Sequence, residues 1–138
     1  MKRYVIDTNC LIYYVTDRNL KQQEKIADYF KDAADLKLRL VILCAVLTEL
    51  VYVFLKVYNI DERTISGILS ALDETPGIEI ENYCSLPTIL SLWPDKIRDY
   101  GDAIIAAYAR DHDISVITFD KDFQAQLDQC GVSIEKPI

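Results

Sequence analysis

The sequence predicts an α/β fold with a mainly parallel sheet and helices on both of its faces. Short apolar runs typical of buried strands alternate along the chain with longer segments of helical periodicity. The chain has 138 residues, of which 51% are hydrophobic, enough for one sizeable core. We therefore expect a single domain over residues 1–138, because no repeat, low-complexity tract or linker interrupts the pattern.

The first elements are a short strand and two helices. Residues 3–6 form an apolar run that predicts a buried strand, and the polar residues 7–9 precede an expected helix over 10–15. Residues 20–36 predict an amphipathic helix, since apolar side chains recur on one face among charged ones: Leu20, Ala27, Phe30 and Ala34.

A second strand and two further helices follow. Residues 38–43 are rich in leucine and β-branched side chains, which favours a strand. Residues 45–58 are apolar nearly all round and too long for a strand, so we expect a helix buried on more than one side. Asp61 is the expected N-cap of a helix through residue 73, with four apolar side chains inward: Ile65, Ile68, Leu69 and Leu72.

The rest of the chain continues the alternation. Thr75-Pro76-Gly77 ends the preceding helix. The expected elements are then a strand at 78–80, helices at 85–92 and 101–110, a strand at 115–118, a helix at 121–129 and a strand at 132–134.

Four acidic residues adjoin the most apolar segments: Asp7, Glu49, Asp102 and Asp120. A carboxylate is costly to bury unless it is paired or bound to a metal. In open α/β sheets, ligands bind beyond the carboxyl ends of the strands. Asp7 and Asp120 each follow a predicted strand, and the other two lie near the starts of predicted helices. We therefore expect the four carboxylates to share a cation site.

Carboxylate ligands favour Mg²⁺ or Mn²⁺ over zinc or copper. Such ions can activate water and stabilise the leaving oxygen in phosphodiester hydrolysis, which requires no nucleophilic side chain. The single histidine, His112, excludes a ribonuclease that uses two histidines, and we expect it at the surface. No CxxC pair occurs among the four cysteines, so we interpret them as small buried side chains in a reducing cytoplasm.

The net charge of −7 argues against a protein that simply coats nucleic acid, because such proteins are usually basic. Two bound divalent cations would reduce this charge to −3, so a nucleic-acid substrate remains compatible. No secretory signal is apparent at the first residues. Glu49 interrupts the longest apolar stretch, residues 40–55, which argues against a membrane span. We expect a cytoplasmic protein.

Four motifs resemble those of the PIN-domain nucleases, in order and at the expected separations. They are Asp7-Thr8-Asn9-Cys10-Leu11-Ile12, Thr48-Glu49-Leu50, Gly101-Asp102-Ala103-Ile104-Ile105-Ala106 and Thr118-Phe119-Asp120-Lys121-Asp122-Phe123. The resemblance covers nearly the whole chain and is greatest to the VapC-type toxins of toxin–antitoxin pairs. It implies a flavodoxin-like three-layer α/β/α fold and an Mg²⁺- or Mn²⁺-dependent endoribonuclease that leaves 5′-phosphate and 3′-hydroxyl ends.

The resemblance also implies a role for each site residue. Asp7, Asp102 and Asp120 would hold metal directly or through water, and Glu49 would bind metal or orient its water. Asn9 and Thr118 would position these carboxylates or the scissile phosphate, with Asp122 as an accessory ligand and Asp99 as its rival. The implied partners are an RNA substrate and a VapB-type antitoxin.

Each assignment has a structural alternative. Asp7 and Asp102 could be helix N-caps, and Asp120 could simply begin a turn. Glu49 could pair with Lys56 as a buried ion pair. Asn9 and Thr118 could make only local hydrogen bonds.

The function likewise has alternatives. The chain could be a catalytically inactive interaction module whose apolar helix at 45–58 seats a partner helix or a second copy. It could instead hydrolyse small phosphate esters, although Asp7-Thr8-Asn9 lacks the DxDx(T/V) pattern of covalent phosphatases. The same helix predicts a homodimer, because it would otherwise leave an exposed apolar patch. The tyrosines either fill the core and interfaces or stack on single-stranded RNA bases, and the scattered basic residues Lys37, Arg39 and Arg98 are candidate contacts to an RNA backbone.

Overall fold

The computed structural model describes all residues, 1–138, and confirms the alternation of strands and helices. In chain order the elements are β1 (Arg3–Ile6), α1 (Thr8–Val15), α2 (Leu20–Ala34), β2 (Arg39–Leu43), α3 (Cys44–Lys56), α4 (Glu62–Glu74), β3 (Ile78–Glu81), α5 (Leu86–Leu92), α6 (Tyr100–His112), β4 (Ser115–Ile117), α7 (Lys121–Gln129) and β5 (Ile134–Glu135).

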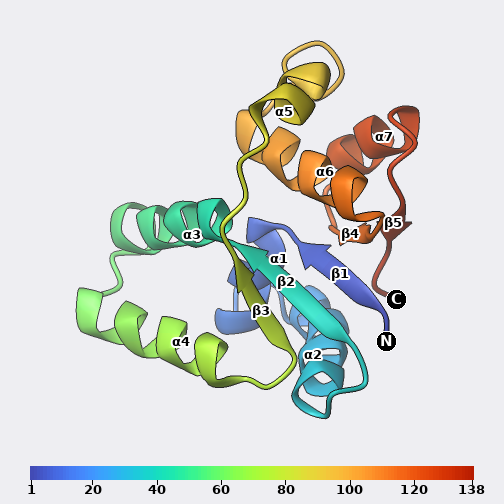
Figure 1. Cartoon of the computed structure of the whole chain (residues 1–138). Helices are drawn as coiled ribbons and strands as arrows, with labels where there is room; N and C mark the ends of the chain where they lie inside the picture. The colour runs from blue at the N-terminus through green and yellow to red at the C-terminus, as the bar shows by residue number, and fades with distance from the viewer.

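The five strands form one parallel sheet in the order β3-β2-β1-β4-β5. The central strand β1 pairs through Val5 with Val41 of β2 and with Val116 of β4. Helices α5, α6 and α7 lie on one side of the sheet, and α1 and α2 lie on the other (Figure 1). This is the predicted three-layer α/β/α arrangement.

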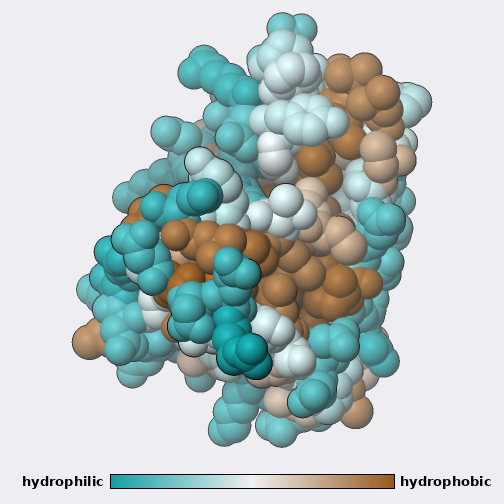
Figure 2. All heavy atoms as spheres, turned by 90° about the vertical axis from the view of Figure 1, so that its left-hand side faces the viewer, coloured by the Kyte–Doolittle hydropathy of each residue, from teal (hydrophilic) through white to brown (hydrophobic).

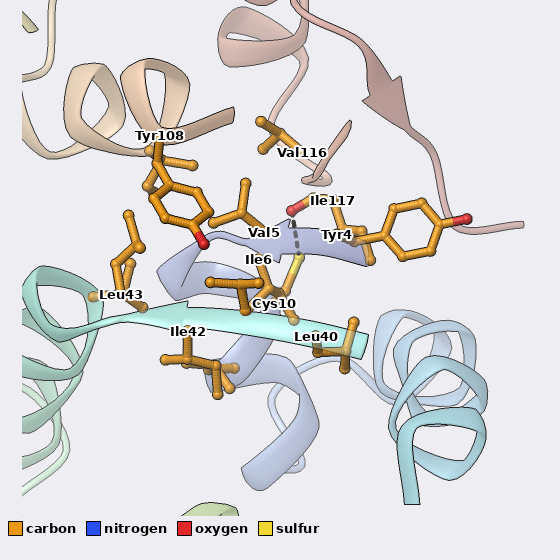
Figure 3. Close-up of a cluster of buried hydrophobic side chains, with 14 of the residues drawn as sticks. Tyr4, Val5, Ile6, Cys10, Leu40, Ile42, Leu43, Tyr108, Val116 and Ile117 are labelled. Atoms are coloured by element: carbon orange, nitrogen blue, oxygen red, sulfur yellow. Dashed lines mark hydrogen bonds between the residues drawn. The ribbon is translucent and has the colours of Figure 1, made fainter. Parts of the chain in front are cut away.

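The core is built on β1, which is covered on both faces. Val5 and Ile6 have no exposed surface, as expected for a strand in the middle of a parallel sheet. Figure 3 shows side chains from both helical layers meeting around this strand, including Cys10 of α1 and Tyr108 of α6. The Cys10 thiol donates to the Ile117 carbonyl at 3.5 Å, so Cys10 joins α1 to β4.

Helix α3 differs from the prediction that it is buried on more than one side. Only one stripe of the helix is fully buried, at the spacing of an amphipathic helix: Val46, Leu50 and Phe54. Tyr52 remains 63% exposed, and Val57, which follows the helix, 58%. The prediction was wrong because hydrophobicity on all sides of a helix does not show how many neighbours will cover it.

Helix α2 also buries a different face from the one expected. Its buried residues are Ile26, Phe30 and Ala33. Leu20 is 65% exposed and Ala34 is also exposed, so the buried stripe lies one position away from the one that the apolar pattern predicted. His112 is exposed as predicted, whereas among the cysteines only Cys10 is fully buried. None of the seven helices has the length and apolar character that crossing a bilayer requires.

Two glycines should respond oppositely to alanine substitution. A Cβ at Gly77, just before β3, would lie 2.1 Å from the Ala33 carbonyl oxygen of α2, whereas one at Gly67 in α4 would meet nothing within 4 Å. We expect Gly77→Ala to lower the free energy of unfolding by about 1–3 kcal/mol because backbone must move. Gly67→Ala should raise it by about 0.5–1 kcal/mol through helix propensity.

Urea denaturation of the two variants beside the unchanged chain measures both effects. Equal stability of Gly77→Ala and the unchanged chain would show that α2 and β3 are not packed as closely as the structure indicates.

Candidate active site

The four predicted carboxylates lie at the carboxyl edge of the sheet. Asp7 directly follows β1, and Asp120 follows β4. Glu49 belongs to α3, which begins where β2 ends, and Asp102 lies in the first turn of α6. Burial raises the pKa of Asp102 most, and the negative charges of Asp99, Asp7, Asp120 and Glu49 add to that rise, so the other three predicted carboxylates lie within electrostatic range of Asp102.

Asp7 is the buried member of the cluster, with 4% of its surface exposed. One carboxylate oxygen, Oδ1, accepts the amide of Cys10 at 3.0 Å, and Oδ2 accepts the buried hydroxyl of Thr118. Burial raises the pKa of Asp7, and the hydrogen bonds from Thr118 and Cys10 oppose that rise. Asp7 therefore caps α1, as its structural alternative predicted, and also lies within electrostatic range of Asp102 and Asp120.

Thr118 connects two of the acidic residues. Besides donating to Asp7, its Oγ1 accepts the amide of Asp120 at 3.1 Å. The Asp120 carboxylate in turn caps α7 by accepting the amides of Asp122 at 2.9 Å and Phe123 at 3.1 Å through Oδ1. Thr118 has no exposed surface, so this bridge fixes the ends of β1 and β4 relative to each other.

Glu49 is held by a threonine that the sequence did not identify. The hydroxyl of Thr8 donates to Glu49 Oε2 at 2.9 Å. The alternative of a buried ion pair with Lys56 is wrong, because Glu49 is exposed and the three ion pairs of the chain join Arg3 and Arg39 to glutamates of β3. In the sequence Thr8 only suggested a helix cap, and nothing in the pattern connected it with a residue 41 positions away.

Asp102 is not the N-cap of its helix. Asp99 takes that position, and its carboxylate accepts the backbone amide of Asp102 at 2.9 Å. The Asp102 carboxylate itself makes no hydrogen bond within the chain. Burial, followed by the charges of Asp99 and Asp7, raises the pKa of Asp102 to about 7. The backbone here is close to the cluster, since a Cβ at Gly101 would lie 3.7 Å from Glu49 Oε2.

Asn9 and Asp122, the two remaining candidates, have exposed side chains. Asn9 is exposed in the first turn of α1, and its side chain makes no hydrogen bond within the chain. Asp122 is exposed in the first turn of α7 and contacts Asp120 only through its backbone amide.

The donor set fits a hard divalent cation. None of the clustered carboxylates forms an ion pair, and their oxygens are the ligands that Mg²⁺ and Mn²⁺ prefer. No three acidic, histidine or cysteine side chains converge closely enough to hold an ion between them. Mg²⁺ is usually held by one or two carboxylates and keeps several waters, so spaced carboxylates suit it.

Several solved structures have a similar fold. VapBC2 from Rickettsia felis, solved bound to a DNA fragment from their promoter, matches with a TM-score of 0.71, at 17% identity and over 99% of both chains. FitAcB from Neisseria gonorrhoeae matches with a TM-score of 0.63, at 16% identity and over 95% of both chains. VapBC-1 from nontypeable Haemophilus influenzae matches with a TM-score of 0.61, at 15% identity and over 97% of both chains.

At these identities the similarity establishes the fold alone. No curated protein matches the sequence. The family model of the PIN domain matches residues 4–126, which include all four acidic positions and most of the chain. PIN domains are generally nucleases. The chain therefore belongs to the PIN domain family.

Proposed function

We propose that this protein is an Mg²⁺- or Mn²⁺-dependent endoribonuclease and the toxin of a VapBC-type toxin–antitoxin pair. The observation that carries the proposal is the cluster of Asp7, Glu49, Asp102 and Asp120, which has no cationic partner within the chain. Family membership supports the nuclease class, and the VapBC structures of similar fold support the toxin role. Residues 1–138 would act as one PIN-like domain.

Asp7, Asp102 and Asp120 would hold the cation, directly or through water. When bound, the cation would activate water for attack on the phosphodiester and neutralise charge on the leaving oxygen. Thr118 hydrogen-bonds to both Asp7 and the amide of Asp120, and Thr8 donates to Glu49, which would bind the cation or orient its water. Asp122 would be an accessory ligand, and Asn9 would position these carboxylates or the scissile phosphate.

An apolar surface on α3 and α4 supports the proposed protein partners. A shallow cavity of about 310 Å³ lies between these helices, lined by Val51, Leu55, Glu62, Ile65, Ser66 and Leu69. Figure 2, which views the side of the molecule with α3 and α4, shows a hydrophobic band bordered by hydrophilic residues. Together with the exposed Tyr52 and Val57, it supports a homodimer and a VapB-type antitoxin as partners.

The alternative is a catalytically inactive PIN-fold interaction module. The same apolar surface favours it, as does the absence of three carboxylates converging on one point. Metal binding separates the two functions, because an inactive module has no reason to retain a cation site.

Cleavage of a labelled total-RNA pool tests the proposed function. We expect discrete fragments with Mg²⁺ or Mn²⁺ and none with a chelator. Asp7→Asn and Asp102→Asn should each lower the cleavage rate by at least about 100-fold, since each removes a charge that would hold the cation. Asp73→Asn, which removes an exposed carboxylate of α4, is the matched control and should cleave normally.

Cleavage by Asp7→Asn at the unchanged rate would refute the assignment of the site. If the folded protein neither cleaves RNA nor binds Mn²⁺ by calorimetry, the interaction module is the better conclusion.

The burial of Asp102, together with the negative charges around it, should make the metal-free protein less stable as the pH rises. The pKa of Asp102 is about 7 in the folded chain and about 3.9 when unfolded, so the folded state binds more protons between these values. Stability therefore falls from about pH 4 to pH 7. In chelator at pH 8, Asp102→Asn should be about 1–2 kcal/mol more stable than the unchanged chain, after allowance for screening by solvent.

Urea denaturation at pH 5 and pH 8 measures this difference, with Asp73→Asn again as control. Added Mg²⁺ should stabilise the unchanged chain at pH 8 more than the Asp102→Asn variant. If Asp102→Asn and the unchanged chain lose stability equally between pH 5 and pH 8, the fold does not raise the pKa of Asp102 as inferred.

The oligomeric state tests the apolar surface. Light scattering at micromolar concentration should give the mass of a dimer, because pairing covers Tyr52 and the α3–α4 cavity. Tyr52→Glu should shift the mass toward that of a monomer, whereas Arg63→Glu on exposed α4 should not. A monomer mass for the unchanged chain would exclude the homodimer at that concentration.

A further inference from the structure

A fifth carboxylate, that of Asp99, lies at the border of the candidate active site. Its Oδ1 accepts the amide of Asp102 at 2.9 Å, whereas its Oδ2 makes no hydrogen bond within the chain. Asp99 also belongs to none of the three ion pairs. After burial, the charge of Asp99 is the largest cause of the raised pKa of Asp102, ahead of the charge of Asp7. Asp99 therefore acts on the same region as the four predicted carboxylates.

Capping alone does not account for an aspartate at this position. Asp61, the N-cap of α4, uses both carboxylate oxygens on Thr64, whose amide donates at 3.0 Å and whose hydroxyl donates at 2.6 Å. In α6 the equivalent position holds Asp102, which supplies only its amide and carries the same charge as the cap. Like charges on adjacent turns destabilise a helix, and a neutral asparagine caps as well as aspartate does. The charge of Asp99 is thus unfavourable for α6 itself.

Gly101 leaves open space between Asp99 and Glu49. A Cβ at Gly101 would lie 3.2 Å from Asp99 Oδ1 and 3.7 Å from Glu49 Oε2, so the two carboxylates border the same small volume. Gly101 lies within α6 and does not have a positive φ, so its backbone does not require glycine. Alanine would favour the helix more. What the glycine provides here is room between two carboxylates that form no ion pair.

We propose that Asp99 is an outer ligand of the cation site, holding a water molecule of the bound cation in the space over Gly101, opposite Glu49. This inference rests on the proposed function and deepens it. No three side chains converge closely enough to hold an ion directly, so water would complete its coordination. Residues that hold such waters tune metal affinity. The sequence left Asp99 only as a rival of Asp122 for this role.

Mn²⁺ binding by the full chain without RNA, measured by calorimetry at pH 8, tests the role of Asp99. Asp99→Asn and Asp99→Ser both keep an N-cap and remove the charge. Each should weaken Mn²⁺ binding about tenfold, the lower end of the loss typical for an outer partner of a metal site. Asp61→Asn makes the same change in the cap of α4 and should bind Mn²⁺ as the unchanged chain does.

Gly101→Ala tests the space over the glycine. It should not lower the midpoint of urea denaturation, because alanine favours the helix, yet it should weaken Mn²⁺ binding because the methyl group occupies the place of the water. Gly67→Ala in α4 is the control and should leave Mn²⁺ binding unchanged. The double variant Asp99→Asn with Gly101→Ala should bind Mn²⁺ about as well as Asp99→Asn, since both changes remove the same water.

Unchanged Mn²⁺ binding by Asp99→Asn and Asp99→Ser would overturn the inference, as would equal weakening by Asp61→Asn or unchanged binding by Gly101→Ala. A chain that binds no Mn²⁺ would overturn it too, whatever the cleavage assay shows. Metal-dependent RNA cleavage by a protein whose Asp99 variants bind Mn²⁺ normally would remove Asp99 and leave the nuclease. Weaker Mn²⁺ binding by those variants, in a protein that cleaves no RNA, would leave the enlarged cation site and remove the nuclease.

Discussion

A buried carboxylate at the end of the central strand constrains the rest of this structure. Asp7 loses nearly all of its hydration, which is tolerable only because the Cys10 amide and the Thr118 hydroxyl replace water. The first of these donors requires α1 to begin at once after β1. The second requires β4 to lie beside β1 in parallel register, so that Thr118 emerges at the same edge. The hydrogen bonds of the Asp7 side chain thus depend on the order of the strands in the sheet.

The same edge gathers further negative charge without neutralising it. Asp102 has no hydrogen-bond donor of its own, and Asp99 and Asp7 contribute to the rise of its pKa to about 7. The bases that form ion pairs, Arg3 and Arg39, pair with Glu79 and Glu81 on β3 and not with the cluster. If the proposed cation binds here, it would offset this uncompensated charge and stabilise the folded chain.

The sequence predicted the elements better than their environments. Strands and helices were identifiable because apolar runs and caps such as Asp61 are local signals. Asp7 and Asp120 follow strands, so a parallel sheet was expected to bring both to its carboxyl edge. Which side of α3 is covered depends on neighbours that no local pattern specifies. The Thr8–Glu49 contact joins distant segments, and Asp99 and Asp102 are equally plausible caps until the backbone is known. These site details required the fold.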